Sequence, residues 1–418
     1  MQIFKFGGAS VKDAEGVKNL AKVLQTVGYK NTLIVVSAMG KTTNALEIVI
    51  KNYFENKAEL KSALQDVIKY HNNILLDVFD NETHPIFKKV SNLFREIDDF
   101  LRTNKSPDYN FVYDQIIGYG ELASTTIISA YLEKIGIKNN WTDAREHIKT
   151  DNYYRRANVN WEATQQNIAS TFNKNRINIT QGFLGSDANN FTTTLGREGS
   201  DYTAAIYAYC LNAESVTIWK DVPGVLNADP RYFENAQLLH QISYTEAIEL
   251  TFYGASVIHP KTLQPLQRKE IPLYVKSFLN PENPGTRVGK GITLKPKIPC
   301  FIVKKNQVLI SLSSLDFSFI VEHNISDIFG LLHLYKMKVD VIQNSAISFS
   351  VCIDNIYDNL EKLLQHLKAK FSVTCHENVS LYTIRHYNTT VLKALEEDKT
   401  VLLKQLTQET VQIVTIPI

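Results

Sequence analysis

The amino-acid sequence predicts an α/β protein: a three-layer αβα sandwich with a mainly parallel sheet, followed by a smaller α+β ferredoxin-like region. Two observations carry this prediction. Near the N-terminus, residues 2–6 have the pattern of a short strand, and a glycine turn and a helix over 14–27 lead to the apolar run 32–37. Such a βαβ unit implies a parallel sheet. Beyond residue 299, strands and helices are expected in the order βαββαβ, which is typical of a ferredoxin-like domain.

The other elements of the first region follow from periodicity. Residues 32–37 are almost continuously apolar, the pattern of a strand buried on both faces. Between 44 and 100 the sequence is mostly helical, with apolar residues of its last helix at spacings of three and four. A second helix is expected over 122–135, after a G-Y-G-E turn. Further buried strands are expected at 177–180, 216–219 and 273–276.

A stretch rich in proline and glycine, 280–299, marks a linker or a domain edge. We therefore expect one domain over 1–290 and a second region over 299–418. A complete set of elements occupies 306–377, with strands or helices at 308–313, 325–337, 338–343, 346–354, 360–370 and 371–376. A second, incomplete set follows from 378 to 418, with elements at 379–386, 391–397, 400–403 and 411–416.

Composition excludes several functional classes. The 418 residues are 44% apolar and 21% charged, as in a soluble globular protein, and the net charge of +2 predicts neither nucleic-acid nor membrane binding. The sequence contains neither a signal peptide nor an apolar run of about 20 residues, so a cytoplasmic protein is expected. The four cysteines lack C-x-x-C spacing, which argues against a disulfide framework or a zinc site.

Two segments near the N-terminus have the residues that anion binding needs. In K-F-G-G, Lys5 could reach a phosphate and the amides of Gly7 and Gly8 could cradle it, although paired glycines more often only turn the chain. In S-A-M-G-K-T-T-N, the hydroxyls of Ser37 and Thr43 could bind a carboxylate at the end of a buried strand. Helix capping by Thr43 or its neighbour explains the second segment about equally well.

Three later segments add charged groups. Glu121, in a glycine-flanked loop, could bind an ammonium group or simply favour a helix N-terminus. The run T-T-T-L-G-R-E-G-S-D, 192–201, is the strongest signal, because Arg197 offers a fork for a carboxylate and capping accounts for only one of its residues. The loop W-K-D-V-P-G-V-L-N-A-D-P-R, 219–231, suits a nucleotide, with Arg231 able to meet phosphate, although a plain connection is commoner.

Together these segments resemble the aspartokinases of the amino-acid kinase superfamily. The resemblance covers about residues 1–290 in the family's order and spacing. The tail is similar to the paired ACT modules of these enzymes, with 300–304 as a detached strand of the second module. The matching segments are K-F-G-G-A-S-V, V-S-A-M-G-K-T-T-N, G-Y-G-E, D-A-R-E-H-I-K-T-D, T-Q-G-F-L-G, T-T-T-L-G-R-E-G-S-D-Y-T-A-A, W-K-D-V-P-G-V-L-N-A-D-P-R and H-P-K-T.

The resemblance implies transfer of the γ-phosphoryl group of ATP to the β-carboxylate of L-aspartate, the first step toward lysine, threonine and methionine, with Mg²⁺ arriving on the nucleotide. It implies that Lys5 neutralises the phosphoryl group, that Asp201 orients Lys5, and that Gly7 and Gly8 donate N–H groups. Arg197 would hold the α-carboxylate of aspartate and Glu121 its ammonium. The aspartate pocket would be completed by Ser37, Thr43, Phe183 and Ser200, and the nucleotide would meet Lys220, Asp221, Leu226, Arg231 and Lys261. The protein itself would supply no metal ligands, and a homodimer is expected.

The sequence departs from the family pattern on the nucleotide side and in the tail. Lys220 replaces a common threonine, Leu226 a common tyrosine, and Ser256 the lysine of G-A-K-V. In the tail, 344–350 lacks the usual acid and 316–319 lacks glycine, so feedback by lysine or threonine is not expected. The length implies a monofunctional enzyme.

Two other functions fit the same segments less well. A kinase for glutamate or its N-acetyl derivative is one, but Glu121 and Arg197 favour an unmodified α-amino acid. A non-catalytic amino-acid sensor is the other, and the presence of Lys5 and Asp201 argues against it.

Overall fold

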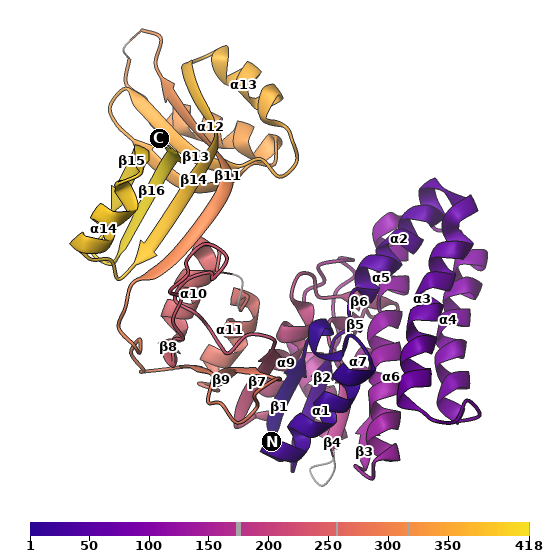
Figure 1. Ribbon diagram of the computed structural model, residues 1–418. Coiled ribbons are helices and arrows are strands. Elements are labelled where there is room, and N and C mark those ends of the chain that lie inside the picture. The colour runs from indigo at the N-terminus through magenta and orange to yellow at the C-terminus, as the bar shows by residue number, and fades with distance from the viewer. Residues whose placement is uncertain (173–176, 256–257, 317, 418) are drawn as a thin grey trace. The chain divides into compact units, whose positions relative to one another are not determined.

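The computed structural model describes residues 1–418 except 173–176, 256–257, 317 and 418 (Figure 1), so Ser256 lies outside the described residues. The chain divides into two compact units. The first comprises 1–225, 238–248 and 257–294; the second comprises 226–237, 249–256 and 295–418.

The first unit is built on an eight-stranded sheet with the order β3-β4-β2-β1-β7-β9-β10-β8. Its strand pairs are parallel except β9 with β10, which confirms the prediction of a mainly parallel sheet. The sequence missed the short strands of three or four residues, whose patterns are too brief to detect. The strands are β1 (Gln2–Phe6), β2 (Thr32–Val36), β3 (Asn139–Trp141), β4 (Ile177–Gln181), β7 (Ser215–Lys220), β8 (Gln241–Ser243), β9 (Leu273–Ser277) and β10 (Thr286–Gly289).

Successive side chains of β1 point to opposite faces of the sheet and so contact two different layers of helices. Phe4 and Phe6 pack into the core shared with α1 (Ala14–Val27), whose first turn is capped by Asp13. Lys5, between them, points to the opposite face, where α9 (Gly199–Leu211) packs against β1. The α9 layer also includes α8 (Trp161–Thr171) and α11 (Pro260–Arg268). The sheet between two helical layers confirms the predicted sandwich.

The predicted helical excursion is a group of helices that stand side by side in Figure 1 and share one apolar core. Its last two helices meet at Gly118, whose backbone is helical, so Glu121 lies in the first turn of a helix. The prediction that Glu121 sits in a loop is therefore wrong, because the two glycines of G-Y-G-E continue the helix. These helices are α2 (Thr42–Glu55), α3 (Lys57–Val78), α4 (Pro85–Thr103), α5 (Tyr109–Ile117) and α6 (Tyr119–Lys134).

Four further elements of the first unit surround the ends of the strands. They are the 3₁₀ helix η1 (Gly8–Val11), the short helix α7 (Ala144–His147) and the hairpin of β5 (Leu184–Ser186) with β6 (Thr192–Thr194). Helix α10 (Tyr244–Tyr253) continues the chain after β8.

The second unit contains a six-stranded antiparallel sheet with the order β12-β13-β11-β14-β16-β15. We predicted separate strands at 300–304 and 308–313, and at 371–376 and 379–386. Each pair is instead one strand of 14 residues, β11 (Cys300–Ser313) and β14 (Ser372–Arg385). The prediction of separate strands is wrong because the polar residues between them interrupt the apolar pattern without ending the ladder, which continues across two register shifts.

Helices pack against the sheet in two separate places and form a separate core in each. Helices α12 and α13 enclose a core with Val308, Ile310 and Leu312 of β11, and α14 encloses another with Ile384 of β14. Within these long strands, residues 300–304 pair with 381–385. The remaining elements are α12 (Glu322–Leu334), β12 (Lys338–Asn344), β13 (Ser348–Asp354), α13 (Leu360–Lys368), α14 (Thr389–Glu396), β15 (Lys399–Leu406) and β16 (Thr410–Pro417).

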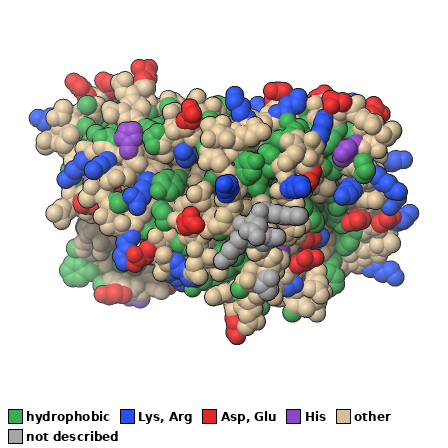
Figure 2. Space-filling view, turned by 90° about the horizontal axis from the view of Figure 1, so that it is seen from below, with side chains coloured by type: hydrophobic (Ala, Val, Ile, Leu, Met, Phe, Trp, Pro, Cys, Tyr) green, Lys and Arg blue, Asp and Glu red, His purple; other side chains and the backbone are tan. Residues whose placement is uncertain are grey.

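Charged side chains of both signs are interspersed over the face seen in Figure 2, in keeping with the small net charge. None of the described helices is both long enough and apolar enough to cross a bilayer.

Candidate active site

Four loops meet at one edge of the first unit's sheet, because the parallel strands β4, β2, β1 and β7 are neighbours and end in register. Phe6 is level with Val36 on one side and Trp219 on the other. Backbone bonds then tie the loops together: the amide of Ser37 donates to the carbonyl of Phe6 at 3.1 Å, and that of Gly182 to Val36 at 2.9 Å. The carboxyl edge of a parallel sheet is the usual ligand site of such folds.

A buried ion pair lies at the centre of this edge. The Nζ of Lys5 is 2.6 Å from Oδ1 of Asp201, and the Asp201 side chain is only 3% exposed. Asp201 stands in the first turn of α9, which begins after Glu198, a residue in the left-handed conformation. The alternative that Ser200 or Asp201 caps this helix is therefore wrong, and the Asp201 carboxylate is directed to Lys5.

A second lysine approaches the same carboxylate. Lys220 is the last residue of β7, and its Nζ lies 3.9 Å from Oδ2 of Asp201. The sequence singled out Lys220 as a departure on the nucleotide side; the structure brings it to the Lys5–Asp201 pair.

Glu121 is buried nearby with one oxygen unsatisfied. Its side chain accepts a hydrogen bond from the amide of Ala38, whereas Oε2 has no hydrogen-bond partner among the described residues. Burial raises its pKa to about 8, against opposing effects from the backbone amides and the charge of Lys5. Gly120 allows this close approach, because a Cβ there would lie 2.9 Å from that of Ala38. A buried carboxyl with a free oxygen suits a cationic ligand group.

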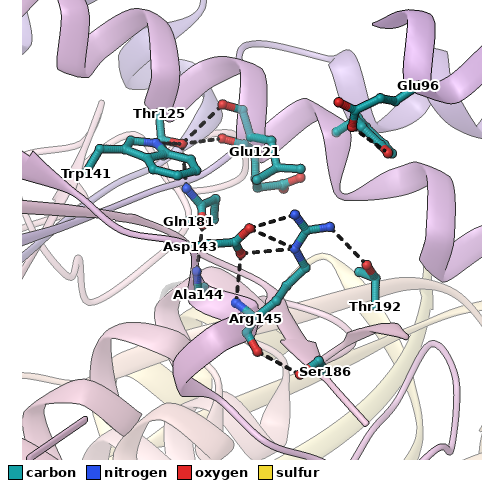
Figure 3. A network of polar contacts seen from close by, with 12 residues as sticks. Glu96, Glu121, Thr125, Trp141, Asp143, Ala144, Arg145, Gln181, Ser186 and Thr192 are labelled. Carbon is teal, nitrogen blue, oxygen red and sulfur yellow. Dashed lines mark hydrogen bonds and ion pairs between the residues drawn. The ribbon is translucent and has the colours of Figure 1, made fainter. Parts of the chain in front are cut away.

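Gln181, at the end of β4, fixes the position of the helix that carries Glu121. Its Nε2 donates at 2.8 Å to Oγ1 of Thr125, which in turn donates to the carbonyl of Glu121 at 2.9 Å (Figure 3). Trp141 donates to the same hydroxyl, and Gln181 accepts from the amide of Ala144 at 2.8 Å. These bonds hold the first turns of α6 to β3, β4 and α7.

The hairpin that leads into α9 is held by two carboxylates. Asp114, buried in α5, accepts from the amide and hydroxyl of Thr194 and from the amide of Arg155 at 2.8–3.1 Å. Burial raises the pKa of Asp114 to about 6 despite these bonds. Asp143 makes a bidentate ion pair with Arg145, and Nη1 of Arg145 donates a hydrogen bond to Oγ1 of Thr192 at 3.2 Å (Figure 3).

Sequence reasoning gave none of these positioning residues a role. The segment D-A-R-E-H-I-K-T-D was noted only as part of the resemblance, and it contains Asp143 and Arg145. Asp114 lies in an ordinary amphipathic helix, and nothing in the sequence distinguishes it.

The segments that carry Phe183 and Ser200 pass very close to each other at two glycines, Gly182 and Gly199. Phe183 adopts a left-handed conformation (φ 73°), and its amide donates to Oγ1 of Thr203 at 2.9 Å. A Cβ on Gly182 would lie 2.4 Å from that of Ser200, and one on Gly199 would lie 2.6 Å from the Phe183 ring. The glycines of T-Q-G-F-L-G and G-R-E-G-S-D are therefore required by close approach.

Replacing Gly182 with alanine should lower the free energy of unfolding by about 1–3 kcal/mol, because the new methyl must displace Ser200. The expected result is a lower melting temperature, measured by circular dichroism. Gly330→Ala is the matched control: its Cβ would point into open space on α12, so this variant should be as stable as the wild type or more stable. Equal melting temperatures for Gly182→Ala and the wild type would contradict the packing described.

The other predicted substrate residues differ in how deeply they are buried. Ser37 and Thr43 are half-buried, and α2 begins after Lys41, so neither Thr43 nor Asn44 caps it. Arg197 is exposed at the turn before α9. Gly7 and Gly8 pass close to Lys5 and Gly40: a Cβ on Gly7 would lie 3.3 Å from the Lys5 Nζ.

The predicted nucleotide residues are divided between the two units. Asp221 is exposed directly after Lys220, and Lys261 is half-buried in the first turn of α11. Leu226 and Arg231 belong to the second unit. There Arg231 forms an ion pair with Asp229, with 2.6 Å between Nη2 and Oδ2. Among the described residues, no group of three or more His, Cys, Asp or Glu side chains could hold a metal ion.

The chain is similar in sequence to known proteins. The amino acid kinase family matches residues 1–277. The chain is 31% identical to lysine-sensitive aspartokinase 3 of Escherichia coli (strain K12), over 91% of this chain and 86% of that protein. It is 30% identical to the chloroplastic bifunctional aspartokinase/homoserine dehydrogenase 2 of Arabidopsis thaliana, over 88% of this chain and 42% of that protein.

A solved structure is similar over nearly the whole chain. The crystal structure of E. coli aspartokinase III in complex with aspartate and ADP (R-state) has a TM-score of 0.80 and 27% identity, with 99% of this chain and 96% of that chain covered. On these matches, and on the sheet edge that unites Lys5, Glu121 and Asp201, the chain belongs to the amino acid kinase family and, within it, to the aspartokinases.

Proposed function

We propose that the protein is an aspartate kinase, which transfers the γ-phosphoryl group of ATP to the β-carboxylate of L-aspartate and gives 4-phospho-L-aspartate. One observation carries the proposal: the buried, unsatisfied oxygen of Glu121 lies close enough to the Lys5–Asp201 pair for the charge of Lys5 to affect its pKa. An α-ammonium site beside a cationic transfer centre suits an amino acid with a side-chain carboxylate.

The transfer needs positioning and charge neutralisation rather than a protein nucleophile. An oxygen of the β-carboxylate attacks the γ-phosphorus, and the bond from that phosphorus to the bridging oxygen breaks as ADP leaves with the electron pair. Lys5 offsets the repulsion between the two anions, and Asp201 keeps its ammonium in place. Glu121 holds the α-ammonium, Arg197 the α-carboxylate, and the pocket is completed by Ser37, Thr43, Phe183 and Ser200.

The nucleotide is proposed to bind beside β1 and β7. The amides of Gly7 and Gly8 would donate to phosphate oxygens, and a Cβ on Gly7 would lie only 3.3 Å from the Nζ of Lys5. Mg²⁺ would neutralise phosphate charge and be held largely through phosphate oxygens and water. The ADP of the E. coli structure supports a nucleotide here. The remaining contacts within the first unit are proposed for Lys220, Asp221 and Lys261.

For the chain as a whole, we propose a catalytic domain over 1–290 and an ACT-like region over 299–418. The complete module would span 306–377, and the second would combine 299–304 with 378–418. Dimerisation through the ACT-like region follows from this assignment, and light scattering on the purified protein would test it.

The activity can be tested by trapping the product. The protein is incubated with ATP, Mg²⁺ and hydroxylamine, and with aspartate, glutamate or N-acetylglutamate, and the acyl hydroxamate is measured. We expect aspartyl hydroxamate, and only background from a Lys5→Ala control. Absence of aspartyl hydroxamate above that control would refute the proposal, and glutamyl hydroxamate instead would identify a glutamate kinase.

The same assay tests regulation. Because segments 316–319 and 344–350 lack the usual glycine and acid, added lysine or threonine should leave the rate of aspartyl hydroxamate formation unchanged. Inhibition by either amino acid at millimolar concentration would contradict this expectation.

A further inference from the structure

Helix α5 is bonded to both walls of the proposed aspartate pocket. One wall is α2, with Thr43 in its first turn, and the other is the turn that follows β6 and carries Arg197. Helix α5 packs against α2 and also against β6. The bonds come from three consecutive residues of this helix, 113–115, which we call the α5 bracket.

Tyr113 joins the bracket to α2. Its side chain is 6% exposed, and its hydroxyl donates to Oε1 of Glu47 at 3.0 Å. Glu47 follows Thr43 by four residues, so the two side chains lie on the same face of α2, one turn apart. The bond from Tyr113 therefore positions the face of α2 that carries Thr43.

Asp114 and Gln115 join the bracket to β6. The carboxyl group of Asp114, which is fully buried, accepts from the backbone amide of Thr194 at 2.9 Å and from its hydroxyl at 2.8 Å. The side chain of Gln115 donates to the carbonyl of Thr192 at 2.9 Å and accepts from its backbone amide at 3.1 Å. Both ends of this three-residue strand are thus fixed to one helix.

The bracket acts on Arg197 through the turn that begins after Thr194. Asp114 also accepts from the backbone amide of Arg155 at 3.0 and 3.1 Å. A Cβ on Gly196 would lie 3.3 Å from the carbonyl oxygen of Arg155, so this backbone packs against the turn. One carboxyl group therefore holds the strand that enters the turn and the segment that lies against it.

We propose that the α5 bracket sets the distance between Thr43 and Arg197, and so determines which length of amino-acid side chain the pocket accepts. Its members are positioning residues, since each acts through α2 or through the β6 turn. The inference rests on the proposed kinase function and adds a specificity determinant to it. A pocket of fixed width favours aspartate over glutamate, which is longer by one methylene, a difference commonly worth about 10–200-fold.

Calorimetric titration with L-aspartate and L-glutamate tests the proposal on the wild type, Asp114→Asn and Tyr113→Phe. We expect the preference for aspartate, the ratio of the two dissociation constants, to fall at least about tenfold in Asp114→Asn, because an NH₂ donor replaces one acceptor oxygen. Tyr113→Phe removes one hydroxyl and should lower the preference about threefold. This milder variant decides the matter if Asp114→Asn does not fold. In the hydroxamate assay, both variants should raise KM for aspartate and leave kcat within about threefold of the wild type.

Two substitutions in the second unit are matched controls. Asp327→Asn removes an exposed ion pair to Lys370, and Tyr335→Phe removes a hydroxyl that bonds to His366. Each should keep the preference of the wild type. A general loss of stability would weaken the binding of both amino acids alike, so an unchanged preference in the two α5 variants would overturn the inference.

Hydrogen exchange without substrate separates this inference from the proposed function. The amide of Leu195 donates to the carbonyl of Phe183 at 3.0 Å, and that amide should exchange at least about tenfold faster in Asp114→Asn than in the wild type. Unchanged exchange would show that α5 does not hold the turn, whatever the protein phosphorylates. A wild type without aspartyl hydroxamate would refute the kinase function, while the exchange rates would still decide whether the bracket holds the turn.

Discussion

Replacing Asp201 with asparagine is expected to lower kcat by about 10²–10³-fold, because two cations lose the charge that positions them. Asparagine keeps the shape of the side chain but not its charge. Lys5, 2.6 Å away and largely buried, would then be free to move away from the reacting groups or toward solvent. The measurement is kcat and KM for both substrates, with the melting temperature of each protein.

The matched control for Asp201→Asn is Asp99→Asn, which removes an exposed ion pair to Arg102 on α4. Exposed pairs contribute at most about 1 kcal/mol, and this one is remote from the sheet edge, so activity and melting temperature should stay close to the wild type. An Asp201→Asn enzyme with wild-type kcat would show that the ion pair is structural only.

Replacing Glu121 with glutamine should raise KM for aspartate by about 10²-fold, since a hydrogen bond between charged groups in a buried site is worth about 1.5–3 kcal/mol. The effect should fall on KM more than on kcat, because Glu121 binds the ammonium and not the reacting carboxylate. Glutamine keeps the contact with the amide of Ala38, so the melting temperature should change little. Unchanged KM would exclude Glu121 from substrate binding.

The same carboxyl predicts a pH dependence. Its pKa, raised to about 8 by burial, means that it is mostly protonated at pH 6–7 in the free protein, and an ammonium ligand requires the ionised form. Apparent affinity for aspartate should therefore rise with pH up to about 8, by as much as about tenfold per unit. Calorimetry in buffers of different ionisation enthalpy should show a proton released on binding, and Glu121→Gln should release none.

The raised pKa of Glu121 also makes the free energy of unfolding depend on pH. The dependence is opposite in sign to that of a carboxyl whose pKa is lowered by folding. The folded protein holds the proton of Glu121 more tightly than the unfolded chain, so this group contributes stability at low pH that is lost as the pH rises from its ordinary pKa of 4.5 toward about 8. Asp114, with a pKa of about 6, likewise contributes stability that is lost as the pH rises from 3.8 to about 6. Bound aspartate should reduce the contribution of Glu121 to this pH dependence of stability.

The sequence predicted the fold well where patterns were long. β1 and α1 were predicted with the bounds that the structure has, because a buried strand, a glycine turn and an amphipathic helix each leave a clear pattern. The tail was predicted less well: the polar residues within β11 suggested two strands, and only the ladder with β14 shows one.

The candidate site was predictable as a set of residues but not as a geometry. The motifs named Lys5, Glu121 and Asp201, yet separations of 116 and 80 residues along the chain give no distance between the side chains. The ion pair of Lys5 with Asp201 depends on how α9 packs on β1, a tertiary contact. Lys220 was a departure in the sequence and a neighbour of Asp201 in the structure, because strand register decides which way a terminal side chain points.

The two 14-residue strands have a consequence for how the second sheet comes apart. β11 and β14 are its two central strands and pair with each other along nearly their whole length. Neither half of the sheet can open without breaking strands that the other half also uses. Hydrogen exchange should therefore report one cooperative opening, with amides at both ends of β11 protected to the same free energy. The tail would then behave as one foldon, although its helices divide it into two.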